Sequence, residues 1–93
     1  MYLKLNAFME EHKDLGFIAW IDSPKKMKML VKGATAEIAT KELLVSLKVS
    51  MAYQLGVDIS KIVEKEITSN QFYSDLLNDL KYKGQKELQL QVA

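Results

Sequence analysis

Four glycines divide the chain at the points where one periodic segment stops and another starts. They are Gly16, Gly33, Gly56 and Gly84. Each is accounted for as a helix end or a turn, so none remains for a glycine-rich loop of the kind that holds a phosphate. With 93 residues, the chain is too short to build two separate cores, and residues 1–93 are expected to form one domain.

The segment before the first glycine predicts a short helix. Its apolar residues and its histidine recur at helical spacing: Leu5, Phe8, Met9 and His12. This spacing predicts a helix from about residue 5 to residue 14 that stops at Gly16. Residues 2–5 also alternate in the way that the start of a strand does, so the first five residues fit either structure.

The next segment predicts a β-hairpin. Residues 17–21 form an unbroken apolar run rich in aromatic and β-branched side chains, which is typical of a strand covered on both faces. Residues 22–26 have the composition of a turn, and residues 27–32 alternate as a return strand does. Phe17 and Trp20 fall on opposite faces of the first strand, and we interpret both as core residues.

Polar residues at helix starts predict three helices in the remainder of the chain. The expected caps are Thr35, Asp58, and Ser69 or Asn70. The first of these helices is long, running to about residue 55, and the last ends at Gly84. Residues 87–92 alternate and predict a final strand that returns to the hairpin. The expected fold is therefore α+β, with a helix, a β-hairpin, a long helix, two shorter helices and a C-terminal strand, in which helices cover a small antiparallel sheet.

The long helix carries apolar residues on two sides. At about 100° per residue, one stripe contains Ile38, Val45, Val49 and Ala52. A second stripe, roughly opposite, contains Leu43, Leu44, Leu47, Met51 and Leu55. Such a helix is either enclosed within its own domain or used partly for a partner. Both arrangements fit a chain of this size, and the second stripe is the candidate interface of a symmetric homodimer.

Several classes of site are excluded by residue usage. The chain has no cysteine and a single histidine, His12, which no acidic pair at ligand spacing accompanies. We therefore expect no enzyme activity, no metal and no cofactor. Residues 1–12 lack the pattern of a signal peptide, and the apolar run at residues 43–49 is far shorter than the ~20 residues that span a bilayer. A cytoplasmic protein without membrane contact is expected.

The charge of the chain argues against nucleic acid as a partner. The formal net charge is +1, and all 13 basic residues are lysines. Balanced charge gives no long-range attraction to phosphates, and arginine, the preferred residue for paired contacts to phosphate and guanine, is absent. Trp20 does lie close in sequence to lysines that would suit a stacking platform for single-stranded nucleic acid, namely Lys25, Lys26 and Lys28. Core packing is our interpretation of its ring.

One local pattern is that of two helices crossing closely at a sharp turn. Ala52 is followed by Gly56 and Val57, and then by Ile62 in the next expected helix. A small residue allows the helices to cross closely, while glycine makes the turn. Over residues 48–67 this pattern resembles the helix-turn-helix motif of DNA-binding repressors.

That resemblance implies contacts to DNA from the second helix of the pair, through Ser60, Lys61 and Lys65. The chain departs from the family pattern, because Lys65 stands where an apolar residue is usual. Asp58, Glu64 and Glu66 would also face phosphates with the wrong sign. An ordinary glycine stop between two amphipathic helices explains the same residues, so a DNA-binding regulator is the alternative function.

The general features of the chain also carry a resemblance. Its size, its all-lysine basicity and the order helix, hairpin, helix resemble those of small uncharacterised proteins of prophages and other mobile elements in low-GC Gram-positive bacteria. The likeness covers the first two-thirds of the chain and implies no activity. The function expected from the sequence is a non-enzymatic protein–protein interaction or regulatory role, with self-association.

Overall fold

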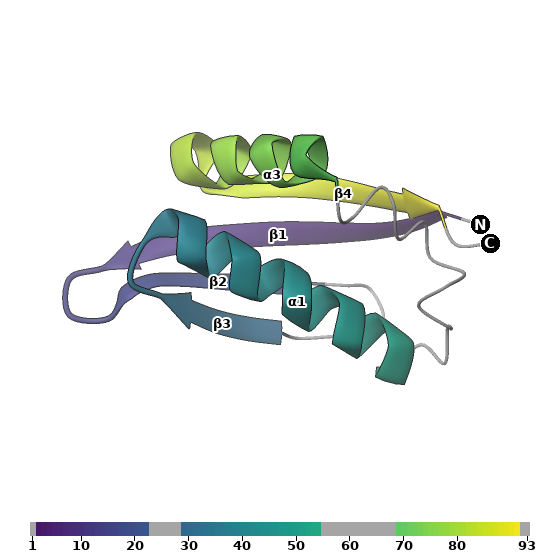
Figure 1. Ribbon diagram of the computed structural model, residues 1–93, viewed down its shortest axis with the longest axis horizontal. Coiled ribbons are helices and arrows are strands. Elements are labelled where there is room, and N and C mark those ends of the chain that lie inside the picture. Colours follow the sequence, from purple (N-terminus) through teal and green to yellow (C-terminus); the bar gives the residue numbers. More distant parts are fainter. Residues whose placement is uncertain (1, 23–28, 55–68, 92–93) are drawn as a thin grey trace.

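The described residues form a four-stranded antiparallel sheet with two helices packed against it (Figure 1). The structure is a computed structural model and describes residues 2–22, 29–54 and 69–91. In chain order the elements are β1 (Tyr2–His12), β2 (Gly16–Asp22), β3 (Met29–Gly33), α1 (Ala36–Gln54), α3 (Asn70–Lys83) and β4 (Gln85–Gln91). The strand order across the sheet is β3-β2-β1-β4. The predicted α+β fold class is confirmed.

The hairpin and the last strand are present, and the last strand has a different neighbour from the one expected. β2 and β3 pair antiparallel, with Trp20 opposite Leu30. β4 pairs with β1 rather than with the hairpin, with Leu88 opposite Leu5. The first and last strands of the chain therefore lie side by side, and β1 is flanked on both sides.

The predicted helix over residues 5–14 is wrong, because these residues lie in β1 and the turn that follows it. Hydrogen-bonded partners on both sides, β2 and β4, hold the β1 backbone in an extended conformation. Side chains of successive residues then alternate between the faces of the sheet, so Leu5 and Met9 enter the core while Phe8 points to the opposite face. Gly16 does not end a helix; it follows a turn between two strands and has a φ of +81°.

The helix ends agree with the predicted caps. The backbone N–H of Ile38 donates to Oγ1 of Thr35 at 3.2 Å, which caps α1. At the start of α3, Ser69 Oγ accepts from the N–H of Phe72 at 3.0 Å. Gly84 ends α3 with a φ of +73° and donates its N–H to the Leu80 carbonyl oxygen. The helix expected to start at Asp58 lies outside the described residues.

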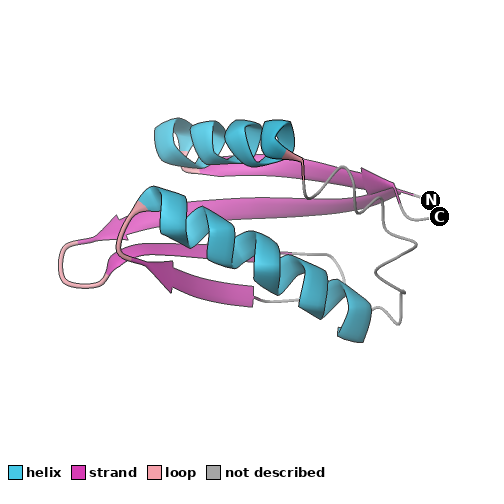
Figure 2. Ribbon diagram, in the orientation of Figure 1, coloured by secondary structure: helices cyan, strands magenta, loops and turns pink. Residues whose placement is uncertain are grey.

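Both helices lie on the same face of the sheet (Figure 2), where α1 packs on β2 and β3 and α3 packs on β4 and β1. The sheet and the helices together contribute the buried apolar side chains of one core, namely Leu5, Ala7, Met9, Ala19, Ile21, Ala36, Ala39, Leu43, Leu47, Leu76, Leu80 and Leu88. α1 approaches the end of β3 very closely. A Cβ atom built on Gly33 would lie 2.4 Å from the backbone nitrogen of Ala39, so only glycine fits there.

Candidate functional site

The face of the sheet opposite the helices is covered by no described element, and it carries large apolar side chains. Register places Phe8 of β1 opposite Trp20 of β2, and Trp20 opposite Leu30 of β3. These three residues form a continuous apolar row across three strands, which we call the apolar row. Ile18, two residues from Trp20 on β2, extends it along the strand. We call the whole uncovered side of the sheet the open face.

The two aromatic rings of the apolar row contact each other. The ring centroids of Phe8 and Trp20 are 5.4 Å apart and the ring planes are inclined by 19°, an offset-stacked arrangement. Both side chains remain partly exposed, and Leu30 is 64% exposed. Apolar surface of this kind, contiguous over neighbouring strands, is typical of a contact site for another molecule.

A hollow of about 520 Å³ lies beside the apolar row. Its lining comes from β1, β2 and β3 and consists of Glu10, His12, Ile18, Trp20, Ile21, Asp22 and Leu30. Ile18 and Leu30 lie beside Trp20 on the open face, while Glu10 and Asp22 supply negative charge on either side of it along the strands. The hollow therefore suits a partner with an apolar centre and polar edges.

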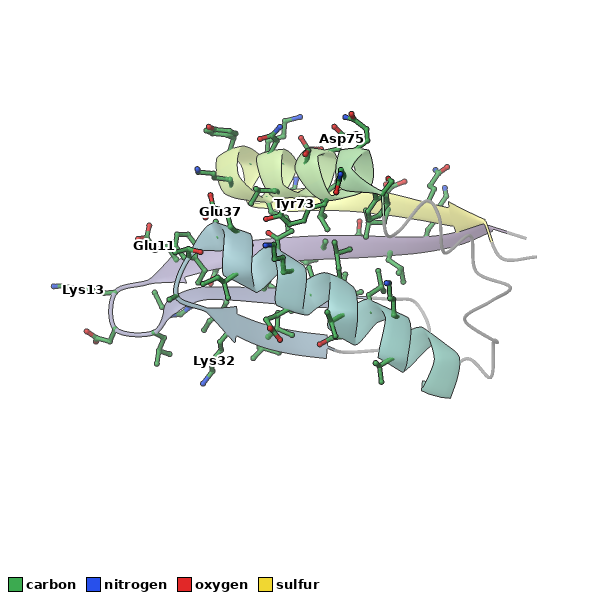
Figure 3. The ribbon with its side chains drawn as sticks, in the orientation of Figure 1. Glu11, Lys13, Lys32, Glu37, Tyr73 and Asp75 are labelled. Carbon is green, nitrogen blue, oxygen red and sulfur yellow. The ribbon has the colours of Figure 1, made fainter. Side chains whose placement is uncertain are left out.

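The charged residues of the open face are arranged across the strands. Lys32 of β3 lies opposite Ile18 of β2, and Ile18 lies opposite Glu10 of β1. Glu10 Oε2 is 3.5 Å from His12 Nε2, and the Glu10 side chain is 64% exposed. Lys32 extends outward from β3 (Figure 3) and makes no ion pair with any described residue. Both charges are therefore accessible to a partner.

The described part of the candidate interface on the long helix belongs to the core. Leu43 and Leu47 are fully buried, and Leu44 is half-buried against them. An interface through Leu43 and Leu47 is therefore wrong, because α1 packs this side against the sheet and against α3. The side chain of Met51 and all of Leu55 lie outside the described residues.

The other stripe of the long helix faces outward. Ile38, Val45 and Val49 are 45%, 59% and 61% exposed, respectively. The helix is thus apolar on two sides, as predicted, with one side in the core and one uncovered within the described part of the chain. The side chain of Ala52 is not described.

Trp20 is a second correction. We expected residues 17–21 to be covered on both faces, with Trp20 in the core. Phe17 does pack against the core, but Trp20 lies on the open face, where no described element covers it. Phe8 and Leu30 were missed as surface residues, and the signal that identifies them is register: both lie beside Trp20 on neighbouring strands.

The residues of the DNA-binding alternative are not placed. Ser60, Lys61 and Lys65 lie outside the described residues, so contact with DNA through residues 48–67 stays a prediction. Elsewhere, no group of three histidine, cysteine, aspartate or glutamate side chains in the described segments is arranged to hold a metal ion. Among the helices that the structure describes, none has the length and apolarity to cross a membrane.

Ion pairs join α3 to the sheet and to α1. Lys86 of β4 donates from Nζ to Oδ2 of Asp79 on α3 at 2.8 Å, and this hydrogen bond lowers the pKa of Asp79. Between the helices, Lys81 Nζ lies 3.5 Å from Glu37 Oε1. Figure 3 shows Glu37 and Tyr73 where α1 and α3 meet, and the Tyr73 hydroxyl donates to the Glu37 carbonyl oxygen at 3.4 Å. These contacts hold the helices on the face opposite the apolar row.

Comparison with known proteins gives no relative from which to carry over a function. No family model, no curated protein and no solved structure matches the chain. The open face is therefore the starting point for a functional proposal.

Proposed function

We propose that this protein is a non-enzymatic cytoplasmic interaction protein that self-associates through the open face of its sheet. The observation that carries the proposal is the apolar row, in which Phe8, Trp20 and Leu30 lie side by side on a face that no described element covers. Removing such surface from water is favourable in proportion to its area. Symmetric pairing is the commonest way in which soluble proteins cover an apolar patch, because one surface then complements itself.

A protein surface fits the open face better than single-stranded nucleic acid does. Bases bind to aromatic rings whose faces are free, and Phe8 and Trp20 each turn one ring face toward the other. Glu10 and Asp22 also line the hollow around Trp20 and would repel phosphates. An apolar protein surface gains from the stacked pair without meeting either obstacle.

The open face is also better placed for association than the exposed stripe of α1. The apolar row joins three strands, and two of its members are large aromatic side chains, which contribute most of the energy in many interfaces. The stripe formed by Ile38, Val45 and Val49 is a narrow line of aliphatic residues on one helix. This stripe therefore provides a matched control surface.

Sedimentation equilibrium of purified protein tests the proposal. At ~100 μM, well above a micromolar dissociation constant, the wild-type protein is expected to be dimeric. Trp20→Glu places a charge within the apolar row and should give a folded monomer, whereas Val45→Glu on α1 should leave the dimer intact. Circular dichroism verifies that each variant is folded.

Two results would count against this function. A wild-type protein that stays monomeric at ~100 μM would end the self-association proposal. Loss of the dimer in Val45→Glu but not in Trp20→Glu would move the interface to α1. A labelled single-stranded oligonucleotide is included in the same experiments, and tight binding that Trp20→Glu abolishes would replace a protein partner with nucleic acid.

A further inference from the structure

One row of residues on the open face has a pattern of charge that is complementary to itself. Two successive rows run across β3, β2 and β1. The first is the apolar row, and the second contains Lys32, Ile18 and Glu10. In each row the β2 residue is central, with its neighbours about 4.8 Å away on either side. The second row therefore has a positive charge on one side of β2 and a negative charge at the matching position on the other side.

Within the described residues, no carboxylate pairs with Lys32 and no lysine pairs with Glu10. Lys32 is exposed and makes no ion pair there. His12 Nε2 lies 3.5 Å from Glu10 Oε2, and the Glu10 side chain is 64% exposed. A partner that brings a carboxylate over Lys32 and an ammonium over Glu10 would match both positions.

We infer that the partner is a second copy of this chain, packed face to face about a two-fold axis that runs along β2, with Lys32 of each copy paired to Glu10 of the other. This inference rests on the self-association proposed above and specifies its geometry. A two-fold axis along β2 brings β3 of one copy over β1 of the other. It places Lys32 over Glu10 twice, Leu30 over Phe8, and Trp20 over its own counterpart.

The spacing of packed sheets allows these pairs. Two sheets that pack face to face lie about 10 Å apart and cross at about 30°. At positions one strand away from the axis, that crossing displaces the two charged residues sideways by only roughly 3 Å. The lysine and glutamate side chains together span the gap between the layers.

Other positions of the axis lose the charge match. If the axis lay between β1 and β2, half a strand spacing away, Glu10 would lie over Ile18 of the other copy. Glu10 would then be buried without a partner, which is costly, and Lys32 would no longer face a carboxylate. The axis along β2 is therefore favoured by the positions of Lys32 and Glu10 as well as by the apolar row.

The open face has the size of a small interface. Its four strands have eleven, seven, five and seven residues, so at about 3.3 Å per residue and about 4.8 Å per strand the face measures roughly 480 Å² in projection. That area lies below the ~800 Å² that each partner buries in a standard interface and is in the range of weak or transient complexes. Gln85 and Glu87 of β4 are exposed beside the apolar row, where a polar rim is expected. The axis along β2 also brings the exposed Asp22 over its own counterpart, and this like-charge contact opposes association and must lie at the hydrated edge of the interface.

Charge reversal tests the pairing. Glu10→Lys would bring two lysines together across the axis, and Lys32→Glu would bring two glutamates together. Each variant alone should raise the dimer dissociation constant by roughly tenfold or more. An equimolar mixture of the two variants restores both opposite-charge pairs and should form a heterodimer, and the double variant should form a homodimer again.

Matched controls lie on the same face outside the charged row. Lys4→Glu on β1 and Glu87→Lys on β4 make the same changes of charge at positions that the proposed axis pairs with no charged side chain among the described residues. Both should leave the dissociation constant within about threefold of the wild-type value. Because all four side chains are exposed, the variants are expected to fold, which circular dichroism checks.

The outcomes separate this inference from the broader proposal. Association of the mixed variants, together with recovery in the double variant, supports the two-fold arrangement along β2. If Trp20→Glu abolishes the wild-type dimer but the mixture and the double variant stay monomeric, the arrangement is wrong while self-association through the open face stands. If the single charge reversals have no effect, the arrangement is also wrong. A monomeric wild-type protein overturns both.

Discussion

Phe8 and Trp20 stack on each other, with ring centroids 5.4 Å apart, on the face of the sheet that is turned away from both helices. In a monomer, each ring is therefore held mainly by the other and by its neighbours within the sheet. Phe17, on the same strand as Trp20, points to the opposite face and packs against the core. Two aromatic residues three positions apart on β2 thus have different roles, one in folding and one at a surface.

Alanine substitutions on β2 should separate these roles. In dilute solution, Trp20→Ala is expected to lower the free energy of unfolding by about 1 kcal/mol, mainly through loss of the stack with Phe8. Phe17→Ala should cost roughly 2–4 kcal/mol because it leaves a cavity against the core. Urea unfolding followed by circular dichroism measures both. A larger loss for Trp20→Ala than for Phe17→Ala would contradict the exposure of the open face.

The two sides of α1 should also respond differently. Leu47→Lys introduces a charge into the core, where the leucine is fully buried, and is expected to unfold the protein rather than merely to split a dimer. Val45→Lys lies two residues earlier on the same helix, at a position 59% exposed, and should change stability by no more than about 0.5 kcal/mol. Thermal unfolding followed by circular dichroism distinguishes these results. A folded Leu47→Lys monomer would return the leucine stripe to the surface.

The helix ends could be predicted because they depend on neighbouring residues. Thr35, Ser69 and Gly84 act as caps through contacts within three or four positions of each helix end, so the local pattern was sufficient. The hairpin was likewise fixed by two apolar segments joined by a short turn. The pairing of β4 with β1 could not be predicted, because no residue near β4 in the sequence determines which distant strand it joins.

The two main errors have one physical cause. The sequence pattern predicts a helix over residues 5–14 because Phe8 adds an apolar residue to the opposite side of a strand whose core residues are Leu5, Ala7 and Met9. It predicts that residues 17–21 are covered on both faces because Ile18 and Trp20 fill the positions between core residues. Both errors come from apolar side chains on the open face. These are surplus to the core of one copy, which is the pattern expected of residues that a partner covers.

The close approach of α1 to the end of β3 predicts that Gly33 cannot be enlarged. Gly33→Ala would place a methyl group 2.4 Å from the Ala39 nitrogen and should destabilise the protein by about 1–3 kcal/mol. Gly84→Ala is the control, since its added Cβ would lie 3.5 Å from the nearest atom and would cost roughly 1 kcal/mol through its positive φ. Urea unfolding measures the two losses, and an equal or smaller loss at Gly33 would contradict the close contact.

The DNA-binding alternative is tested by gel shift. Balanced charge and the absence of arginine predict no binding to duplex DNA tighter than about 10⁻⁶ M at physiological salt. Variants with Lys61→Glu and Lys65→Glu should therefore behave like the wild-type protein. Sequence-selective, salt-sensitive binding that these substitutions abolish would make DNA binding the better account of the function. Ser60 would then belong to the same contact with DNA.

The ion pair between α3 and β4 predicts a specific dependence of stability on pH. The hydrogen bond from Lys86 lowers the pKa of Asp79 below its ordinary value of 3.8, in spite of partial desolvation, which acts in the opposite direction. A carboxyl group whose pKa is lower in the folded state binds protons more readily when the chain is unfolded. Its stabilising contribution is therefore complete above the ordinary pKa and is lost as the pH falls through the lower value of the folded state.

Asp79→Asn should accordingly be less stable than the wild-type protein at neutral pH, and the difference should shrink in acid until it disappears below the folded-state pKa. Asp75→Asn is the matched control one turn earlier on α3, where the carboxylate accepts a hydrogen bond from Gln71 Nε2 and pairs with no described lysine. Urea unfolding between neutral pH and about pH 2 measures both differences. If the loss in Asp79→Asn were independent of pH, the amide would be failing to replace packing or hydrogen bonding rather than charge, and Lys86 would not be the cause of the lowered pKa.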